Sequence, residues 1–456
     1  MKAALAKEDL VTNYAIPRGT LNWDVPLNAA TASIDTRLTQ ISFNVKEYGA
    51  LGNGSNNDAP GIQAAINAAA IAGGGIVYIP AGVYILNQTL NIPAGEGLTI
   101  QGSGWGTSLK LGNNVNTYAL TFGGTDTRIT VRDLEIDGNY LQQSGVSGGI
   151  NGAGAIACLF SNIHFTFCRD ESLLLAGLTG GAFGHVNRVI GCLFDQTTGS
   201  AGSGRGVHMT SNDENQIIFC DFEFLGGAGS NAASIYDESG TNFINSCNFV
   251  NGANNSKGIW IQNAKSTKVT NCNFDGLSGD NVFIAGQRCI VSNNTFFSPG
   301  IAGTAGQASG VYLEFGTSAN VIVGNMIASA PGAGVSRDAI RESSSGGGGN
   351  NNISHNMIVT DGAWSFAALD LSGAGSTVIG NTGTPTAGQA TLVAGTVTVS
   401  TSAITTNSVV VASAITPGGT QGALFVSALT AGTSFTLKST SATDTSVVRW
   451  IILKQS

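Results

Sequence analysis

A short pattern of apolar residues around a small central residue recurs along the middle of the chain. The copies read IGCLF, IFCDF, NSCNF, TNCNF, SNNTF, VGNMI, SHNMI and IGNTG. Their intervals are 28, 27, 25, 22, 31, 31 and 25 residues, and their central residues are Cys192, Cys220, Cys247, Cys272, Asn294, Asn325, Asn356 and Asn381. A period of roughly 20 to 50 residues is typical of a solenoid. The short β-branched and aromatic runs between Gly, Asn and Ser predict strands and turns.

The repeat predicts an all-β fold, a right-handed parallel β-helix in which each copy is one coil. Equivalent residues of neighbouring coils would then stack ~4.8 Å apart. Cysteine thiols and, further on, asparagine amides would fill one internal ladder, because a small apolar group suits a buried site and stacked amides hydrogen-bond along a column. The seven cysteines are therefore expected to be buried and reduced.

A second set of strands runs through the same coils, as GVHMTS, SIYDES, GIWIQN, NVFIAG and GVYLEF. Their first inward positions are Val207, Ile235, Ile259, Val282 and Val311, at intervals of 28, 24, 23 and 29 residues. Alternation along a strand sends the next residue outward. The outward residues are His208, Tyr236, Trp260, Phe283 and Tyr312. They predict an exposed line of rings that stacks on the sugars of a glycan or packs against another subunit. Coincidental exposure, or a face covered by the chain's own loops, is the remaining alternative.

The same face offers candidate catalytic groups. The outward positions two residues later are Thr210, Glu238, Gln262, Ala285 and Glu314, continued by Glu342 if DAIRES is the next strand. Glu238 and Gln262 are expected to help bind substrate. Glu314 and Glu342 would lie one coil apart, near the ~5 Å separation of a retaining glycosidase pair. Asp237 would be buried, which raises the pKa of a carboxyl group. A lyase would need a base and a cation, for which His208 and Arg205 are the nearest combination.

The two ends of the repeat predict different structures. NNDAPGIQAAINAAAIAGGG predicts a capping helix with Asp58 as N-cap and Gly73 closing its C-terminus. Residues 42–384 would form the β-helix with this helix. From Pro385 to Ser456 apolar residues alternate with Ser and Thr, which predicts an antiparallel β-sandwich. Its core would be small, so burial against other subunits is expected.

Composition narrows the function classes. Only 11% of the residues are charged, the net charge is −8 and the Lys and Arg residues are scattered, so nucleic-acid binding is not expected. No charged residue occurs between Asp58 and Glu96, as in a membrane span. However, Pro, Asn, Gln and a Gly run interrupt this stretch and exclude that interpretation. The N-terminus MKAALAKEDLV lacks the apolar core of a signal peptide. No CxxC pair is present, and neither a metal nor a cofactor is expected.

The segment FNVKEYGALGNGSNNDAPGIQAAINAAAIAGGGIVYIPAGVYIL, Phe43 to Leu86, resembles the opening of the pectate-lyase-like β-helix superfamily, and most of all its bacteriophage tailspikes. The resemblance implies a homotrimer in the phage tail, made in the host cytoplasm, that binds and cleaves a bacterial surface polysaccharide. Residues 1–41 would attach it to other tail or baseplate proteins, with a flexible leader as the alternative, and 385–456 would serve trimerisation or sugar binding. Two alternatives stay open: a non-enzymatic receptor-binding or structural appendage, and a cellular polysaccharide lyase or hydrolase.

Two further groups of charged residues are expected to be structural. LEIDGN, Leu134 to Asn139, looks like a coil turn of this superfamily, with Asp137 as a turn former. Arg169, Asp170 and Glu171 form a charge cluster that predicts a solvated turn or an ion pair.

Overall fold

A computed structural model describes residues 42–454, with gaps at 96, 125, 178–183, 196–203, 224–231, 253–255, 302–306, 330–335, 344–348, 360–363, 365–368, 372–375, 382–386, 402, 405, 407 and 432. The predicted virion-attachment segment, 1–41, lies outside the described residues.

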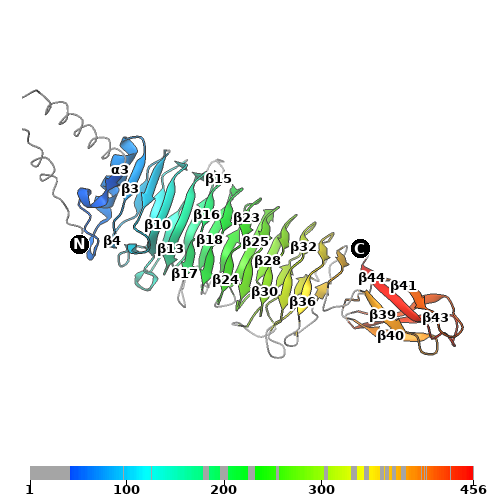
Figure 1. Ribbon diagram of the computed structural model, residues 1–456. Coiled ribbons are helices and arrows are strands. Elements are labelled where there is room, and N and C mark those ends of the chain that lie inside the picture. Colours follow the sequence, from blue (N-terminus) through cyan, green and yellow to red (C-terminus); the bar gives the residue numbers. More distant parts are fainter. Residues whose placement is uncertain are drawn as a thin grey trace, which may run out of the picture.

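The body is a parallel β-helix, as predicted. One coil runs through β25 (Lys257–Lys265), β26 (Lys268–Thr270) and β27 (Asn273–Asp275), and each of these strands pairs in parallel with its equivalent one coil on. Figure 1 shows the strands following one another along a single long axis, with the capping helix at one end and the C-terminal module at the other.

The coils build two large sheets. Sheet A contains 23 strands, among them β7 (Thr107–Leu111), β10 (Thr130–Asp137), β13 (Leu159–Thr166) and β17 (Leu193–Asp195). Sheet B contains 11 strands: β5 (Leu90–Ile92), β8 (Tyr118–Phe122), β11 (Gly148–Asn151), β14 (Glu171–Ala176), β18 (Arg205–Thr210), β22 (Ala233–Asp237), β25, β28 (Val282–Gln287), β31 (Val311–Leu313), β34 (Ile340–Glu342) and β37 (Leu369–Leu371).

Stacked columns fill the interior. The predicted amide ladder is present, since Asn294, Asn325 and Asn356 each donate a side-chain hydrogen bond to the amide oxygen of the next asparagine, at 3.0, 2.9 and 2.9 Å. Beside it runs a column of parallel rings with centroids 4.6–4.9 Å apart: Phe165, Phe194, Phe222, Phe249, Phe274 and Phe296. These columns satisfy the buried amides and bury apolar area in every coil.

The N-terminal cap is the helix α3 (Ala59–Ile71). Its buried face contains the predicted Ile62, Ala65, Ile66 and Ala69, and Gly73 follows it with φ +84°. Asp58 occupies the N-cap position, but its carboxylate makes no hydrogen bond to the helix. It accepts the backbone N–H groups of Leu51 at 2.6 Å and Gly52 at 3.1 Å instead, so it ties the preceding loop to the helix start.

The C-terminal module is antiparallel, as predicted. One sheet consists of β39 (Ala387–Thr391), β44 (Val447–Lys454) and β41 (Ser408–Thr416). The other consists of β40 (Thr396–Ser400), β43 (Ser434–Ser439) and β42 (Leu424–Thr430). Their small core is built around Phe435 and Trp450, whose ring centroids are 5.1 Å apart.

The cysteines allow a simple test of the interior. All seven are free and buried, and burial raises the pKa of Cys168 and of Cys289 to about 12. Since the thiolate is the reactive form, we expect no cysteine of the native protein to react with a thiol reagent at neutral pH and all seven to react after denaturation. Stoichiometric labelling of the native protein, measured by mass spectrometry, would contradict this packing.

Candidate functional site

The outer face of sheet B carries a continuous line of side chains, here called the ring column: His208, Tyr236, Trp260, Phe283 and Tyr312. They are direct cross-strand partners on β18, β22, β25, β28 and β31, as the sequence spacing predicts. Neighbouring ring centroids are 5.2, 5.1, 5.3 and 5.0 Å apart. The fold therefore places one ring of the column in each of five successive coils.

The ring column is less exposed than predicted. Tyr236 is only 5% exposed, Phe283 7% and His208 9%, while Trp260 and Tyr312 are half-buried. From Tyr236 onward the rings meet edge to face, with interplanar angles of 73°, 65° and 82°. Each ring thus covers part of the next, and the prediction of a bare apolar line is wrong.

Three cations lie over the rings. The Arg205 guanidinium carbon is 4.1 Å from the centroid of Tyr236, and the Lys257 ammonium is 3.9 Å from that of Trp260. Arg341 is the cross-strand partner of Tyr312 and lies 3.5 Å from its ring centroid. Burial lowers the pKa of Lys257, against the opposing effect of Asp280 and Glu314. Rings thus hold three cations in place on this face, and the carboxylates of Asp280 and Glu314 lie near Lys257.

Carboxylates meet the column at its His208 end. The side chain of Glu238 lies 2.9 Å from His208 Nε2 and accepts the Tyr236 hydroxyl at 3.0 Å. Glu171 lies 3.3 Å from His208 Nδ1 and accepts the Tyr118 hydroxyl at 2.6 Å. Burial opposes ionisation of Glu171, but hydrogen bonds from His208 and Tyr118 and the charge of Arg205 hold its pKa below the ordinary value. Burial and the Glu238 charge raise the pKa of Tyr236 to about 12.

Sequence reasoning missed Lys257 and did not connect Glu171 with this network. Glu171 was expected in a solvated turn or an ion pair; the ion pair is present, with Arg205 at 3.4 Å, and Glu171 begins β14. Lys257 could have been found, because it precedes Trp260 by three residues, as Arg205 precedes His208. Gln262, predicted to bind substrate, accepts the indole N–H of Trp260 at 2.8 Å and so fixes the orientation of that ring.

The predicted pair Glu314 and Glu342 does not form. Glu342 lies opposite Leu313 on the inward side of β34, because Ile340 aligns with Val311. The assumed alignment was one residue out, and such a slip moves a side chain to the other face. Glu342 is buried and accepts hydrogen bonds from Asn351 and Ser376, whereas Glu314 is half-exposed just after β31.

Replacing the two glutamates should therefore have different effects on the free energy of unfolding. Replacing Glu342 with Ala leaves the Asn351 and Ser376 donors without this acceptor, which should cost about 1–3 kcal/mol of unfolding free energy. The Glu314→Ala variant should change it by less than about 0.5 kcal/mol. Denaturant titration of both variants measures the contrast, and equal costs would contradict the register described above.

Asp237 is buried, as predicted, but inside the β-helix. It is 0% exposed and accepts hydrogen bonds from Thr267 at 2.6 Å, Asn242 at 2.9 Å and the Ser239 backbone at 3.1 Å. Burial raises its pKa, against the effect of these hydrogen bonds. A carboxyl group in this position cannot contact a polymer on the outer face, so the prediction of a catalytic Asp237 is wrong.

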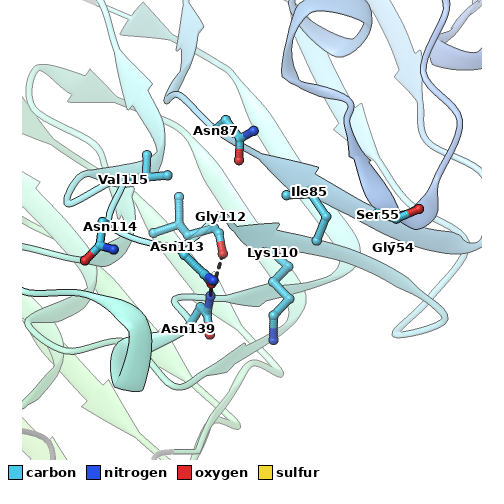
Figure 2. A pocket seen from close by; sticks show the side chains of 11 residues that line it. Gly54, Ser55, Ile85, Asn87, Lys110, Gly112, Asn113, Asn114, Val115 and Asn139 are labelled. Carbon is cyan, nitrogen blue, oxygen red and sulfur yellow. Dashed lines mark hydrogen bonds between the residues drawn. The ribbon is translucent and has the colours of Figure 1, made fainter.

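Two surface hollows accompany these features. One of ≈ 400 Å³ is lined by Asp213, Asn263, Lys265 and Glu238, and Glu238 contacts His208 and Tyr236 of the ring column. A larger one of ≈ 670 Å³, shown in Figure 2, lies over the first coils and is lined by residues that include Lys110, Asn113 and Asn139. Nearby, Asp137 acts as the predicted turn former, because it accepts the Asn139 backbone N–H at 2.7 Å, and it also pairs with Lys110.

Neither a metal cluster nor a membrane helix is found in the part of the chain that the structure describes. No group of three or more His, Cys, Asp or Glu residues there could hold a metal ion. No helix among the same residues is long and apolar enough to span a bilayer.

Two sequence families match parts of the chain. The family described as rhamnogalacturonase A/epimerase, pectate lyase-like matches residues 42–166. The family described as K1 capsule-specific polysaccharide lyase, C-terminal domain, matches residues 381–453.

Among curated proteins, the chain is similar to two mannuronan C5-epimerases of Azotobacter vinelandii. It is 40% identical to AlgE3 over 122 residues, which are 24% of this chain and 7% of that protein. It is 39% identical to AlgE4 over 124 residues, which are 25% of this chain and 22% of that protein. The chain thus spans less than a quarter of the length of either relative.

Solved structures share the fold at low sequence identity. ORF18 of Geobacillus virus E2 is 18% identical with a TM-score of 0.56, and the match covers 94% of this chain and 81% of that one. The Dettilon tailspike protein gp208 is 10% identical with a TM-score of 0.57, covering 92% and 95%. The family match at residues 42–166 confirms the predicted resemblance to the pectate-lyase-like β-helix superfamily.

Proposed function

We propose that this protein is a phage tail appendage that binds a bacterial surface polysaccharide along the ring column. The observation that carries the proposal is the unbroken alignment of five rings and three cations over the coils from β18 to β34. Rings 5.0–5.3 Å apart, with an adjoining hollow at Glu238, suit an extended polymer better than a compact ligand.

Two cations of the ring column favour an acidic polysaccharide. Lys257 and Arg341 lie over rings that hold them in fixed positions, so little side-chain entropy remains to be lost on binding a carboxylate, whereas Arg205 is already paired with Glu171. The names of the matching proteins support this class, since mannuronan is a polyuronate and the C-terminal family is named for a capsule-specific lyase.

A role in the phage tail is supported by likeness of shape. The viral ORF18 and the Dettilon tailspike match this chain over nearly its whole length. In this proposal residues 1–41 attach the protein to other tail or baseplate proteins, and the protein is made in the host cytoplasm before it enters the virion.

The contacts of the His208 ring nitrogens favour binding without cleavage. Both of its ring nitrogens face carboxylates, Glu171 and Glu238, and Nδ1 also lies 3.1 Å from Arg205. A general base needs a free nitrogen within reach of the substrate proton, and this network leaves none until it opens. Cleavage with His208 as base and Arg205 as cation is the second candidate, and a cellular lyase or hydrolase is the third.

The experiment uses capsular polysaccharides and lipopolysaccharides purified from a panel of bacteria. Biolayer interferometry on the immobilised protein should find a capsule that binds, and a reducing-end assay on that capsule decides between binding and cleavage. Release of reducing ends that disappears in the His208→Gln variant would favour the second candidate. Absence of binding to every polysaccharide in the panel would contradict the proposal.

We also propose that the C-terminal module joins three copies of the chain. Large apolar side chains on its strands are exposed in the single chain, including Val409, Val411 and Ile451 on one sheet and Phe425 on the other. Val411 and Ile451 are direct cross-strand partners, so they form part of one apolar patch. Such a patch on a small module is suited to burial against identical subunits.

Replacing Val411 with Glu should convert the trimer to monomers, because a charge buried in an apolar contact is costly. The Val411→Thr variant is the matched control, since it keeps the side-chain shape and should stay trimeric. Multi-angle light scattering measures both, together with a shortened chain that ends near Gly383. A Val411→Glu protein that remained trimeric would remove this patch from the subunit contact.

A further inference from the structure

A second cluster of polar and aromatic side chains lies on the outer face of sheet A, away from the ring column. Glu135 on β10 and His164 on β13 are direct cross-strand partners, and Asp195 on β17 lies opposite Thr166. The intervening Ile136, Phe165 and Phe194 are fully buried, so the polar side chains point outward. Figure 1 shows β10, β13 and β17 as neighbours in the first half of the β-helix.

The hydrogen bonding of His164 leaves two polar atoms unused. Its Nδ1 lies 3.1 Å from Glu135 Oε2, whereas its Nε2 is 3.9 Å from Asp195 Oδ2, too far for a hydrogen bond. His164 Nε2 and Asp195 Oδ1 are both buried and have no hydrogen-bond partner among the described protein atoms. Polar groups in this state destabilise the folded protein unless something satisfies them.

An exposed aromatic ring lies beside His164. Trp105 is 46% exposed, and its ring centroid is 5.0 Å from that of His164. Its indole N–H donates to the Asn162 carbonyl at 3.3 Å, which fixes the ring orientation while one face stays accessible. An accessible indole face beside fixed polar groups matches a pyranose, which has an apolar face and a rim of hydroxyls.

The charges around this cluster are mostly negative. Besides Glu135 and Asp195, the outward positions nearby include Asp137, which pairs with Lys110, and Asp133, which pairs with Arg132. The His164 hydrogen bond holds the pKa of Glu135 below its ordinary value, while burial raises the pKa of Asp195 against the effect of His164. The remaining negative charge would repel a polyuronate and favours a neutral sugar.

We propose that Trp105, Glu135, His164 and Asp195 form a second saccharide site that takes a neutral pyranose. The sugar's apolar face would lie on Trp105, and one hydroxyl would bridge His164 Nε2 and Asp195 Oδ1. Glu135 is a positioning residue, since it holds the imidazole without facing the sugar. This site differs from the ring column in both sheet and charge, and it stands whether or not the proposed function is right.

Saturation-transfer NMR on the full chain tests this site. The probes are neutral hexasaccharides of glucose, mannose and galactose, with hexagalacturonate as the acidic comparison. At least one neutral probe should bind, and Trp105→Ala and Asp195→Ala should each weaken its binding by about tenfold or more. The Asp195→Ala protein should be at least as stable as the wild type, because it loses a buried carboxyl oxygen that has no partner. If Asp195 had only a structural role, the Asp195→Ala protein would be less stable than the wild type.

Two control variants separate this site from the others. Phe315→Ala removes a ring that is 57% exposed just after β31, several coils away, and Lys257→Met alters the ring column; both should bind the neutral probe normally. The proposal is overturned if no neutral probe binds, if hexagalacturonate binds more tightly, or if the two site variants bind like the wild type. A change of oligomeric state in Trp105→Ala would also overturn it, by identifying this face as a subunit contact.

Discussion

Replacing Lys257 and Arg341 together with Met should weaken binding of the acidic polysaccharide by roughly 30- to 700-fold, or about 2–4 kcal/mol. Both cations lie over rings of the ring column, at 3.9 and 3.5 Å from the centroids of Trp260 and Tyr312. Methionine keeps much of the apolar stem against the ring and removes the charge, so packing should change little. Isothermal titration calorimetry with the polysaccharide that binds the wild type measures the difference.

A charge-matched control exists on the other sheet. Lys268 lies 4.8 Å from the centroid of Phe243 on sheet A, and Arg188 is exposed on the same sheet at the equivalent position three coils earlier. The Lys268→Met/Arg188→Met protein loses the same net charge and a similar cation–ring contact. It should bind within about twofold of the wild type. Equal losses in the two double variants would mean that binding follows overall charge rather than the ring column.

Replacing Phe249 with Ala should lower the free energy of unfolding of the β-helix by about 3–5 kcal/mol. Phe249 is fully buried, and its ring stacks on Phe222 at 4.9 Å and Phe274 at 4.6 Å. In a solenoid each coil is stabilised by its two neighbours, so a cavity at this ring weakens two contacts at once. Denaturant unfolding followed by circular dichroism measures the loss.

The matched control for Phe249 is Phe219→Ala. Phe219 belongs to the same β-helix but is largely exposed, so its removal should change the unfolding free energy by less than about 0.5 kcal/mol. A Phe249→Ala protein as stable as Phe219→Ala would show that the phenylalanine column does not stabilise the coils.

The sequence predicted the repeating parts of the fold well, for a physical reason. A position such as Asn325 or Cys220 recurs once in every coil, so its inward direction is specified several times over. The ends were predicted from local rules, which worked for Gly73 but not for the side chain of Asp58. That carboxylate binds the loop before the helix, and no helix-capping rule includes this contact.

The sequence predicted that the five rings align but not which groups contact them. Alternation located the five rings, yet it could not show that they turn edge to face or that Arg205 and Lys257 lie over them. The prediction for Glu342 was wrong because a three-residue strand contains too little pattern to fix its register. His164 and Trp105 went unnoticed since they come from segments 59 residues apart and meet only when the coils stack.

Radical footprinting of the full-length protein, with and without the bound acidic polysaccharide, tests the central claim most directly. Hydroxyl radicals oxidise accessible rings, and mass spectrometry locates the oxidised residues. If the polymer lies along the ring column, saturating polysaccharide should protect Trp260 and Tyr312, the two half-buried rings, and leave Phe219 and Trp105 unchanged. Oxidation of Trp260 and Tyr312 at the same rate in the saturated complex would contradict the account.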